Sequence, residues 1–298
     1  MNKQKGEDHN NHKLELKRLA DQHDVLLDAM GGQGLVAPID LTQPQMRFLD
    51  SGAADGRWLL DLRRSFGNGA GSGHHYFGTD VNPSLFPSSP PADVCFRQQS
   101  ILEPFPPEWR GTFHVVHQRL VMAVVKPPAT SIDSVVEEFA GLLRPEGWLQ
   151  LVELDNDCVP ENGPALRRLL QYHQQNSAAG GLGPNLSVHL AGAMRNAGLR
   201  HVEVRRVDVL YGARNTGGRE LKEKSTQSLS DVVGPVLAQA KVATPEKLYK
   251  DDVLNLPFLL QKEIEKLGGL SYLGLQYSPY TVVLQLHAKV YCMQQPTS

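Results

Sequence analysis

Short apolar runs alternate with amphipathic stretches through the middle of the chain, from about residue 45 to residue 155. Runs of about four to eight residues that are rich in β-branched and aromatic side chains are typical of buried strands. Between them, apolar residues recur every three or four positions, as in a helix with one buried face. This alternation predicts βαβ units and a parallel sheet covered by helices on both faces. The five expected strands are MRFLD, HYFGTD, VCFRQQ, FHVVHQ and WLQLVELD.

Helical patterns flank this central region on both sides. Before it, residues 14–29 carry apolar residues at helical spacing, and the pair Gly31-Gly32 ends the pattern as a helix stop. After it, residues 164–176 and 187–197 show the same helical spacing. We therefore expect one helix before the sheet and two helices after its fifth strand.

The last third of the chain predicts two more strands with helices between them. Residues 201–210 alternate apolar and polar positions, a mostly helical segment follows from about Gly218 to Gly269, and residues 280–292 alternate again. We expect the two alternating runs to form an antiparallel pair, interrupted by a helical insertion that covers the ligand edge of the sheet. The expected organisation is an N-terminal helical lid over 1–44, a core over 45–210 and 276–298 with a cap helix at about 160–185, and a helical cap insertion over 211–275.

Composition and charge exclude several classes of protein. The chain has 298 residues with 30 Lys and Arg against 32 Asp and Glu, so no basic field exists to attract nucleic acid or anionic lipid. Its apolar runs fall short of the roughly 20 residues that cross a bilayer, so we expect no membrane span. The polar start offers no signal-peptide core, and we expect a cytoplasmic protein without a metal site. The three cysteines form no CxxC pair and lie at Cys95, Cys158 and Cys292.

One stretch of the sequence has the form of a cofactor-binding turn. The first expected strand ends in Asp50, small residues follow in the pattern Asp50-x-Gly52-x-Ala54-x-Gly56, and a helical pattern begins directly behind them. Such a turn lets ligand atoms approach the backbone closely. A dinucleotide site is disfavoured, because the spacing is not GxGxxG and because Asp50 would repel a pyrophosphate. A cationic amino-acid group suits this carboxylate better.

The next two strands also end in residues suited to a ligand. Asp80 closes the second strand, where a doubly wound fold hydrogen-bonds a ribose diol. Ser100 and Ile101 follow the third strand and offer one polar and one apolar side chain to a base. An acid at a single strand end is more often a turn residue than a ligand contact. Three successive strand ends in this order nevertheless favour one extended ligand.

This ordered series, with the run LRPEGWLQ at 143–150, resembles the motifs of class I S-adenosylmethionine (SAM)-dependent methyltransferases over about half of the chain, residues 45–155. The resemblance implies an α/β, Rossmann-like fold with a mostly parallel seven-stranded sheet, an antiparallel last strand and helical cap insertions. It implies SAM as the cofactor and S-adenosylhomocysteine as its product. The cofactor-binding residues that it indicates are Gln22, His23, Asp50, Gly52, Ala54, Gly56, Asp80, Val81, Ser100, Ile101 and His117.

A narrower resemblance is to fungal small-molecule methyltransferases of secondary-metabolite clusters, including the N-methyltransferases of epipolythiodioxopiperazine pathways. It rests on three runs, RLADQH at 18–23, FHVVHQRL at 113–120 and WLQLVE at 148–153. Members of the group read H-x-R-L after the fourth strand, and His117-x-Arg119-Leu120 keeps this pattern. This chain departs from the usual pattern at three positions. Ala54 and Glu146 stand where glycine is usual, and Ser100 stands where an acid near the adenine is usual.

The expected catalytic residues lie at the carboxyl ends of the fourth and fifth strands, which form the ligand crevice of an open α/β sheet. Methyl transfer is an in-line displacement, so the protein supplies alignment and, for a hydroxyl or amide substrate, removal of a proton. His117 is the expected base, because imidazole titrates near neutral pH, although a packed histidine bonded to a carbonyl is equally compatible. Glu153 shares the floor of the crevice. Arg119 is expected to orient cofactor or substrate, or to pair with Glu153 or Asp155.

The sequence therefore predicts an enzyme that transfers a methyl group from SAM to an oxygen or nitrogen of a small natural product in fungal secondary metabolism. The expected partner is this small molecule, with no nucleic acid, and the apolar stripes of the cap helices are compatible with a homodimer. Two alternatives stay open: a SAM-binding regulator or partner protein, and a SAM-assisted cyclase that transfers no methyl group. In the cap, His173 and His189 are expected at the surface.

Overall fold

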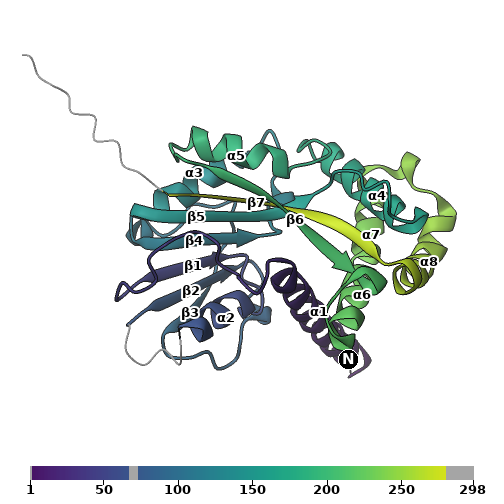
Figure 1. Cartoon of the computed structure of the whole chain (residues 1–298), viewed down its shortest axis with the longest axis horizontal. Helices are drawn as coiled ribbons and strands as arrows, with labels where there is room; N and C mark the ends of the chain where they lie inside the picture. Colours follow the sequence, from purple (N-terminus) through teal and green to yellow (C-terminus); the bar gives the residue numbers. More distant parts are fainter. Residues whose placement is uncertain (1, 67–72, 280–298) are drawn as a thin grey trace, which may run out of the picture.

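The sheet is the centre of the fold. The computed structural model describes residues 2–66 and 73–279. Within these residues seven strands form one sheet in the order β3-β2-β1-β4-β5-β7-β6 (Figure 1). Four of the strands are buried along most of their length, which is why they read as apolar runs in the sequence. The strands are β1 (Arg47–Ser51), β2 (His75–Asp80), β3 (Val94–Gln98), β4 (Phe113–Arg119), β5 (Leu143–Asp155), β6 (Glu203–Tyr211) and β7 (Gly269–Pro279).

The direction of the strands confirms the expected topology. Strands β1 to β5 pair in parallel, and β7 is antiparallel to both of its neighbours, β5 and β6. The chain order reverses between β1 and β4, which lie side by side at the middle of the sheet. In open α/β sheets the ligand crevice opens outside the carboxyl ends of the strands at this reversal. The ends of β1 and β4 are therefore the place to examine for a site.

The last strand begins earlier than the sequence analysis placed it. Strand β7 starts at Gly269 and pairs with β6 through residues 269–277, whereas the expected strand at 280–292 lies outside the described residues. Residues 269–275, which we assigned to the cap insertion, are thus part of the sheet. Apolar residues alternate with small or polar ones only over residues 273–278 of β7. This alternation is shorter than the one at 280–292, which is why the sequence analysis placed the strand at the later run.

Helices cover both faces of the sheet and extend beyond one end of it. Helix α2 packs on β1 and β2, and α3 and α5 pack on the opposite face. Helices α4, α6, α7 and α8 form the cap, with α1 between the cap and the sheet (Figure 1). No helix of the described residues is long and apolar enough to cross a bilayer. The helices are α1 (Asn2–Ala29), α2 (Arg57–Ser65), α3 (Ile132–Leu142), α4 (Pro164–Ala179), α5 (Ser187–Asn196), α6 (Arg219–Asp231), α7 (Val233–Ala243) and α8 (Lys250–Leu267).

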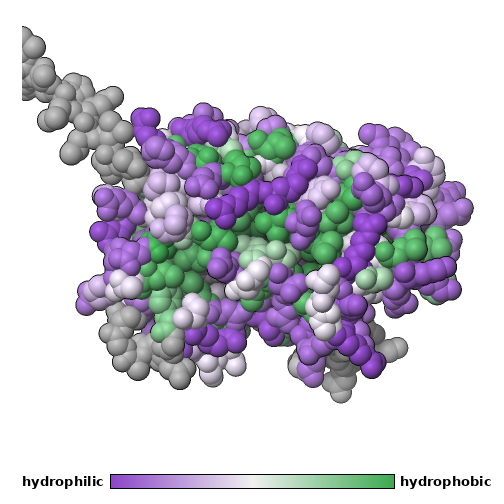
Figure 2. Space-filling view, in the orientation of Figure 1, coloured by the Kyte–Doolittle hydropathy of each residue, from purple (hydrophilic) through white to green (hydrophobic). Residues whose placement is uncertain are grey.

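The cap and α1 share a hydrophobic core with the sheet. One cluster of buried side chains joins Val25 and Leu26 of α1 to Leu169 of α4 and to Leu273 and Leu275 of β7. Burial of such side chains supplies most of the stabilisation of a fold. In the view of Figure 2, apolar side chains gather over the sheet, while the outer helices of the cap are mainly polar. The cap is therefore held against the sheet by apolar contacts, and its outer surface is polar apart from exposed apolar side chains of α8 such as Leu254 and Phe258.

Candidate active site

The turn between β1 and α2 requires glycine at two positions. Gly52 has φ 77° and Gly56 has φ 74°, in the left-handed region that glycine adopts without strain. A Cβ on Gly52 would lie 2.3 Å from Cγ2 of Val121, and a Cβ on Gly56 would lie 2.4 Å from Cζ of Phe96. The glycines are thus needed for the backbone angle and for close packing. They bring the backbone of the turn against the ends of β3 and β4.

Ala54 adopts the same left-handed conformation without being glycine. Its φ is 46°, an angle that costs an alanine roughly 1–2 kcal/mol. We predict that Ala54→Gly raises the free energy of unfolding by about 0.5–1 kcal/mol, after the roughly 0.5–1 kcal/mol entropic cost of glycine is subtracted. Urea unfolding of the two proteins measures this difference. A less stable Ala54→Gly protein would show that the left-handed alanine carries no strain.

The ends of β2 and β3 adjoin this turn, as predicted. Asp80 accepts hydrogen bonds from the backbone N–H of Ala54 at 3.0 Å and of Asn82 at 2.9 Å. Val81 follows it with 60% of its surface exposed, which leaves an apolar surface next to the carboxylate. Beside them, the Ser100 hydroxyl accepts a hydrogen bond from the N–H of Leu102 at 3.1 Å. Asp80 therefore ties the second predicted strand end to the first.

His117 lies against Asp50 across the β1–β4 pair. The two residues are register partners, and Nδ1 of His117 lies 2.8 Å from Oδ1 of Asp50. The imidazole stacks on the indole of Trp58, with ring centroids 3.9 Å apart. Burial lowers the pKa of His117 and outweighs the opposing effect of Asp50, so the ring is neutral at pH 7. The Nδ1–H group donates to the carboxylate, and Nε2 is left as a hydrogen-bond acceptor.

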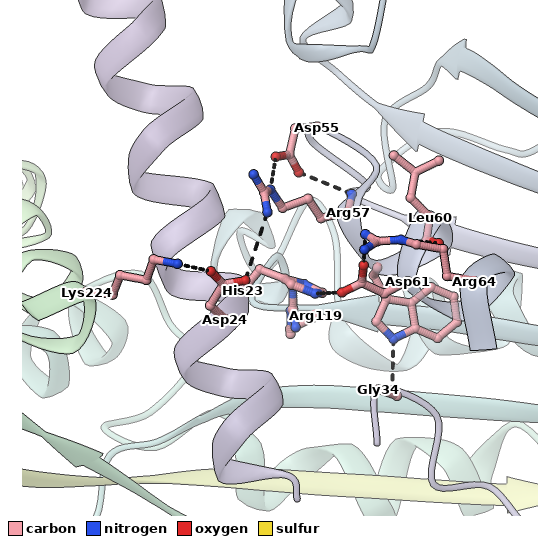
Figure 3. Close-up of polar contacts among 11 residues, drawn as sticks. His23, Asp24, Gly34, Asp55, Arg57, Leu60, Asp61, Arg64, Arg119 and Lys224 are labelled. Carbon is pink, nitrogen blue, oxygen red and sulfur yellow. Dashed lines mark hydrogen bonds and ion pairs between the residues drawn. The ribbon is translucent and has the colours of Figure 1, made fainter. Parts of the chain in front are cut away.

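Arg119 contacts a histidine of the N-terminal helix. Its Nη2 atom donates to Nδ1 of His23 at 3.0 Å, and Nε2 of His23 lies 2.7 Å from Oδ2 of Asp61 (Figure 3). Because a guanidinium only donates, Nδ1 of His23 is the acceptor and its Nε2–H group donates to Asp61. The next residue along α1, Asp24, accepts from Nζ of Lys224 in the cap at 2.8 Å. Helix α1 is thus fixed to β4, α2 and α6 by polar contacts.

These residues surround a small polar pocket of about 60 Å³ at the carboxyl ends of β1 and β4. The guanidinium of Arg119 has no carboxylate of the described residues within 4.0 Å, and the expected pairs with Glu153 and Asp155 are not formed there. Burial lowers the pKa of Arg119, as expected for a cation that lacks a close counterion. The predicted site residues that line the pocket are Gln22, His23, Asp50, Gly52, Ala54, His117 and Arg119. Those outside it are Gly56, Asp80, Val81, Ser100 and Ile101.

A larger apolar cavity of about 280 Å³ adjoins the polar pocket. Gln22 and Leu120 line both spaces. Leu120 has φ 55°, an angle that is rare for a bulky residue, and it places its side chain between them. Nearly half of the cavity wall comes from α1, α4, α6 and β7, and their apolar side chains in it are Val25, Leu26, Leu169, Leu170, Leu229 and Leu273.

Glu153 is buried at the edge of this cavity. Its Oε1 atom accepts hydrogen bonds at 2.8 Å from Nε2 of Gln118 and from the backbone N–H groups of Val121 and Met122. These bonds hold the turn that carries Leu120 and Val121. Burial raises the pKa of Glu153, although each of these donors lowers it. The structure therefore separates the predicted catalytic residues, with His117 and Arg119 in the polar pocket and Glu153 in the cavity.

The cavity also contains residues that the sequence analysis did not find. His173, expected at the surface, lines it together with Asn156 and Asn176. Burial lowers the pKa of His173 to about 4, so its ring is neutral at pH 7. The spacing of His173 and Asn176 on α4 is helical and places both on one face. That spacing was the available signal, but it does not tell a cavity face from a solvated one.

Three buried histidines and the half-buried His173 predict a loss of stability in acid. Burial lowers the pKa of His74, His114, His117 and His173, to about 4 for His114 and His173. Each folded-state pKa lies below the unfolded value of about 6.5, so the unfolded chain takes up protons first as the pH falls. The stability that comes from keeping these histidines neutral is fully present above about pH 6.5 and is lost as the pH falls toward 4. Glu153 changes the free energy of unfolding in the opposite direction, because its folded-state pKa is raised, but it is only one group.

We therefore predict that the free energy of unfolding falls on the order of 3 kcal/mol between pH 7 and pH 4. Urea unfolding at one-unit intervals of pH measures this fall. A His173→Gln variant should show a smaller fall than the wild type, because it lacks one of the four groups. An equal fall in the two proteins would contradict the role given to His173.

The comparisons with known proteins agree with this geometry. A family model described as a methyltransferase domain matches residues 15–204. The N-methyltransferase sirN of Leptosphaeria maculans is 35% identical, covering 86% of this chain and 88% of that protein. The methyltransferase psoC of Aspergillus fumigatus is 32% identical (87% and 91%), and the N-methyltransferase tcpN of Claviceps purpurea is 30% identical (91% and 96%). The chain therefore belongs to the family of methyltransferase domains.

Proposed function

We propose that this protein transfers the methyl group of SAM to a nitrogen atom of a small natural product. The observation that carries the proposal is the pair of adjoining spaces at the ends of β1 and β4. One is polar and holds an arginine that has no carboxylate of the described residues within 4.0 Å, and the other is apolar and holds a buried carboxylate. A charged cofactor and an uncharged organic substrate would meet between them, beside Gln22 and Leu120.

The residues of the polar pocket suit the amino-acid end of SAM. The guanidinium of Arg119 would bind its carboxylate, and Asp50 with Nε2 of His117 would accept hydrogen bonds from its ammonium group. Asp80 would bind the ribose hydroxyls with its remaining lone pairs, and the exposed side chain of Val81 would pack against the adenine. When bound, the sulfonium group supplies an electrophilic methyl carbon.

Helix α1 supports the proposal as a lid. Leu19, Gln22 and His23 line the polar pocket, while Val25 and Leu26 line the cavity, so one helix closes both spaces. Its ion pair with Lys224 and its contact with Arg119 hold it in the closed position. A closed lid excludes water from the reacting groups, which strengthens their electrostatic interactions.

Glu153 is the group that we assign to proton removal. An amide or similar nitrogen must lose a proton when it gains a methyl group, and Glu153 is the carboxylate that lines the cavity. Its raised pKa makes it a better base than an exposed glutamate. His117, bonded to Asp50 in the other space, is assigned to the cofactor instead. The choice of nitrogen over oxygen rests on the names of relatives such as sirN and tcpN, which are N-methyltransferases.

Incubation with SAM that carries a labelled methyl group tests this proposal directly. The panel of substrates contains small phenols, carboxylic acids and cyclic dipeptides, and products are identified by mass spectrometry and by NMR of the labelled carbon. We expect labelled N–CH₃ groups on the cyclic dipeptides and no labelled product from the acids. Tight SAM binding without label transfer to any compound would overturn the proposal. A labelled O–CH₃ product would overturn only the choice of nitrogen.

A further inference from the structure

The hydrogen bonds to the Glu153 carboxylate all fall on one of its two oxygens. Oε1 accepts at 2.8 Å from Nε2 of Gln118 and from the backbone N–H groups of Val121 and Met122. The N–H of Leu154 also lowers the pKa of Glu153, but no donor of the described residues reaches Oε2 with the geometry of a hydrogen bond. The two oxygens therefore have different surroundings.

Oε2 of Glu153 is the oxygen that opens into the cavity. Glu153 lines the cavity and is 3% exposed. Oε2 has no partner among the described residues, yet it is not one of their fully enclosed polar atoms without a partner. The small exposed surface of Glu153 thus includes this oxygen. A molecule in the cavity can reach it.

The three donors determine which oxygen of Glu153 can carry a proton. A protonated carboxyl group donates through one oxygen and accepts with the other. A proton on Oε1 would compete with three N–H groups that already point at this atom, so at least one of their bonds would be lost. A proton on Oε2 leaves all three bonds in place. Glu153 therefore takes up a proton on Oε2, the oxygen that faces the cavity.

Gln118 holds the other oxygen of this carboxylate. Its side chain is 0% exposed, and its own Oε1 atom has no hydrogen-bond partner among the described residues. Rotating the amide by half a turn would place that oxygen against Oε1 of Glu153, and two acceptors repel each other. A buried amide with an unpaired oxygen carries a desolvation cost that an apolar side chain would avoid. The bond to Glu153 is the contact that accounts for an amide here.

We propose that Gln118 is a positioning residue that holds Oε1 of Glu153, so that Oε2 takes the proton from the methyl-accepting nitrogen. This inference rests on the proposed function, because it requires Glu153 to be the base. In this step the N–H bond of the substrate breaks and its proton goes to Oε2. The electron pair left on nitrogen forms the bond to the methyl carbon, and the pair of the carbon–sulfur bond stays on sulfur. Gln118 lines neither space, so it acts through Glu153 alone.

Other titratable side chains share the cavity wall with Glu153. They are His173 on α4, Tyr211 on β6 and Lys126 in the segment after β4. Burial lowers the pKa of His173 to about 4 and raises that of Tyr211, so both are neutral at pH 7. Lys126 is exposed to solvent, which screens its charge. Of the three donors on Oε1 of Glu153, Gln118 is the one that a side-chain substitution removes.

Carbon-13 NMR of the full chain, labelled at the glutamate carboxyl carbons, measures the titration of Glu153 without substrate or turnover. The Glu153 signal is the one that disappears in Glu153→Gln. In the wild type we expect its midpoint above the usual range of a glutamate, because burial raises the pKa. Gln118→Met has a similar volume but lacks the donor, which stabilises the charged form. This variant should therefore raise the midpoint by about one pH unit.

The pH profile of methyl transfer provides a second readout. With labelled SAM, the pH at which kcat falls to half its plateau should rise in Gln118→Met by the same amount as the NMR midpoint, because the same group titrates. On the plateau kcat should be about tenfold lower, since the carboxylate is less well oriented. A purely structural role of Gln118 would lower kcat without moving the profile.

Gln150→Met is the matched control for Gln118→Met. Gln150 is also 0% exposed and lies on the neighbouring strand β5, but its amide bonds to the backbone of Gly34 and Val36. It lines neither space, so the midpoint of Glu153 should stay at the wild-type value. Thermal unfolding identifies the variants that fold. If Gln118→Met does not fold, Gln118→Glu replaces it, because a second carboxyl group of the same shape also raises the midpoint.

Two results would overturn this inference: an unchanged midpoint in a folded Gln118 variant, and an equal rise in Gln150→Met. The titration and the label transfer also separate the two proposals. A midpoint that rises only in the Gln118 variants, without label transfer from SAM, would contradict the proposed reaction and leave the positioning of Glu153 intact. Label transfer with an unchanged midpoint would contradict only the part given to Gln118.

Discussion

Replacing Glu153 with glutamine is expected to lower kcat for methyl transfer by about 10²–10⁴-fold, while SAM binds as in the wild type. The carboxylate is a stronger proton acceptor than His173 in the same cavity, because burial raises the pKa of Glu153 and lowers that of His173 to about 4. An amide cannot take up a proton at neutral pH. The pKa of Glu153 is raised by burial, so the wild-type rate should fall as the pH drops through this raised value. The variant should lack that step in its pH profile. Steady-state rates with labelled SAM between pH 5 and pH 9 measure both effects.

The glutamine variant is expected to keep the fold, which makes the rate loss interpretable. The glutamine oxygen can still accept from Gln118, Val121 and Met122, the three donors that Oε1 of Glu153 holds at 2.8 Å. Glu153→Ala leaves these buried donors unpaired and should lower the free energy of unfolding by about 1–3 kcal/mol.

Glu263→Gln is the matched control for Glu153→Gln. The Glu263 carboxylate accepts from two backbone N–H groups at the start of α4, at 2.9 Å each, but lies outside the cavity wall. Its kcat should remain within about threefold of the wild type, which is the small effect usual for a residue away from the chemistry. A Glu153→Gln enzyme that is equally active would show that the substrate loses its proton without this base.

The strand ends of the site could be predicted from the sequence because each is a local feature. Asp50 and Asp80 follow apolar runs directly, and parallel strands bring their carboxyl ends to one edge of a sheet. Asp50 and His117 lie opposite each other because β1 and β4 are neighbours and pair in this register, which the strand order alone does not determine. The turn glycines were equally local, since Gly52 and Gly56 stand between a strand and a helix.

The contacts of α1 and the wall of the cavity were not predictable in this way. His23 contacts Asp61, which is 38 residues away in the sequence, and Arg119, which is 96 residues away. These contacts depend on how a helix packs against the sheet, and such packing leaves no periodic pattern in the sequence. The same holds for Asn156 and Asn176, which reach the cavity from a loop and from α4. A buried polar residue of this kind reads in the sequence as an ordinary surface residue.

The placement of Glu153 and His117 shows the limit of predicting roles from strand ends. Both residues lie near the carboxyl ends of their strands, as expected, yet they open into different spaces. The turn that holds Leu120 at φ 55° separates them. Because this turn depends on the bonds from Glu153 to Val121 and Met122, the residue that we assign to proton removal also shapes the boundary between cofactor and substrate.

Arg119→Gln is expected to weaken SAM binding by about 10- to 100-fold, the range for losing a hydrogen bond to a charged group. In the free protein the guanidinium donates to His23 and has no carboxylate of the described residues within 4.0 Å. Removing this half-buried cation relieves the cost of a charge without a close counterion but leaves Nδ1 of the buried His23 without its donor. We therefore expect the free energy of unfolding of the free protein to fall by no more than about 1–3 kcal/mol. The 10- to 100-fold loss of affinity concerns only the SAM-bound state. Thermal unfolding with and without SAM separates the two effects.

Decarboxylated SAM identifies the contact that Arg119 makes. The wild type should bind SAM more tightly than the decarboxylated compound by the same 10- to 100-fold, and Arg119→Gln should bind the two compounds about equally. Arg57→Gln is the matched control, because Arg57 lines the same pocket but is already paired with Asp55 at 3.1 Å. That variant should keep the discrimination, since a guanidinium with a carboxylate partner has little left to offer a second one. Discrimination that survives in Arg119→Gln would place the cofactor carboxylate elsewhere in the pocket.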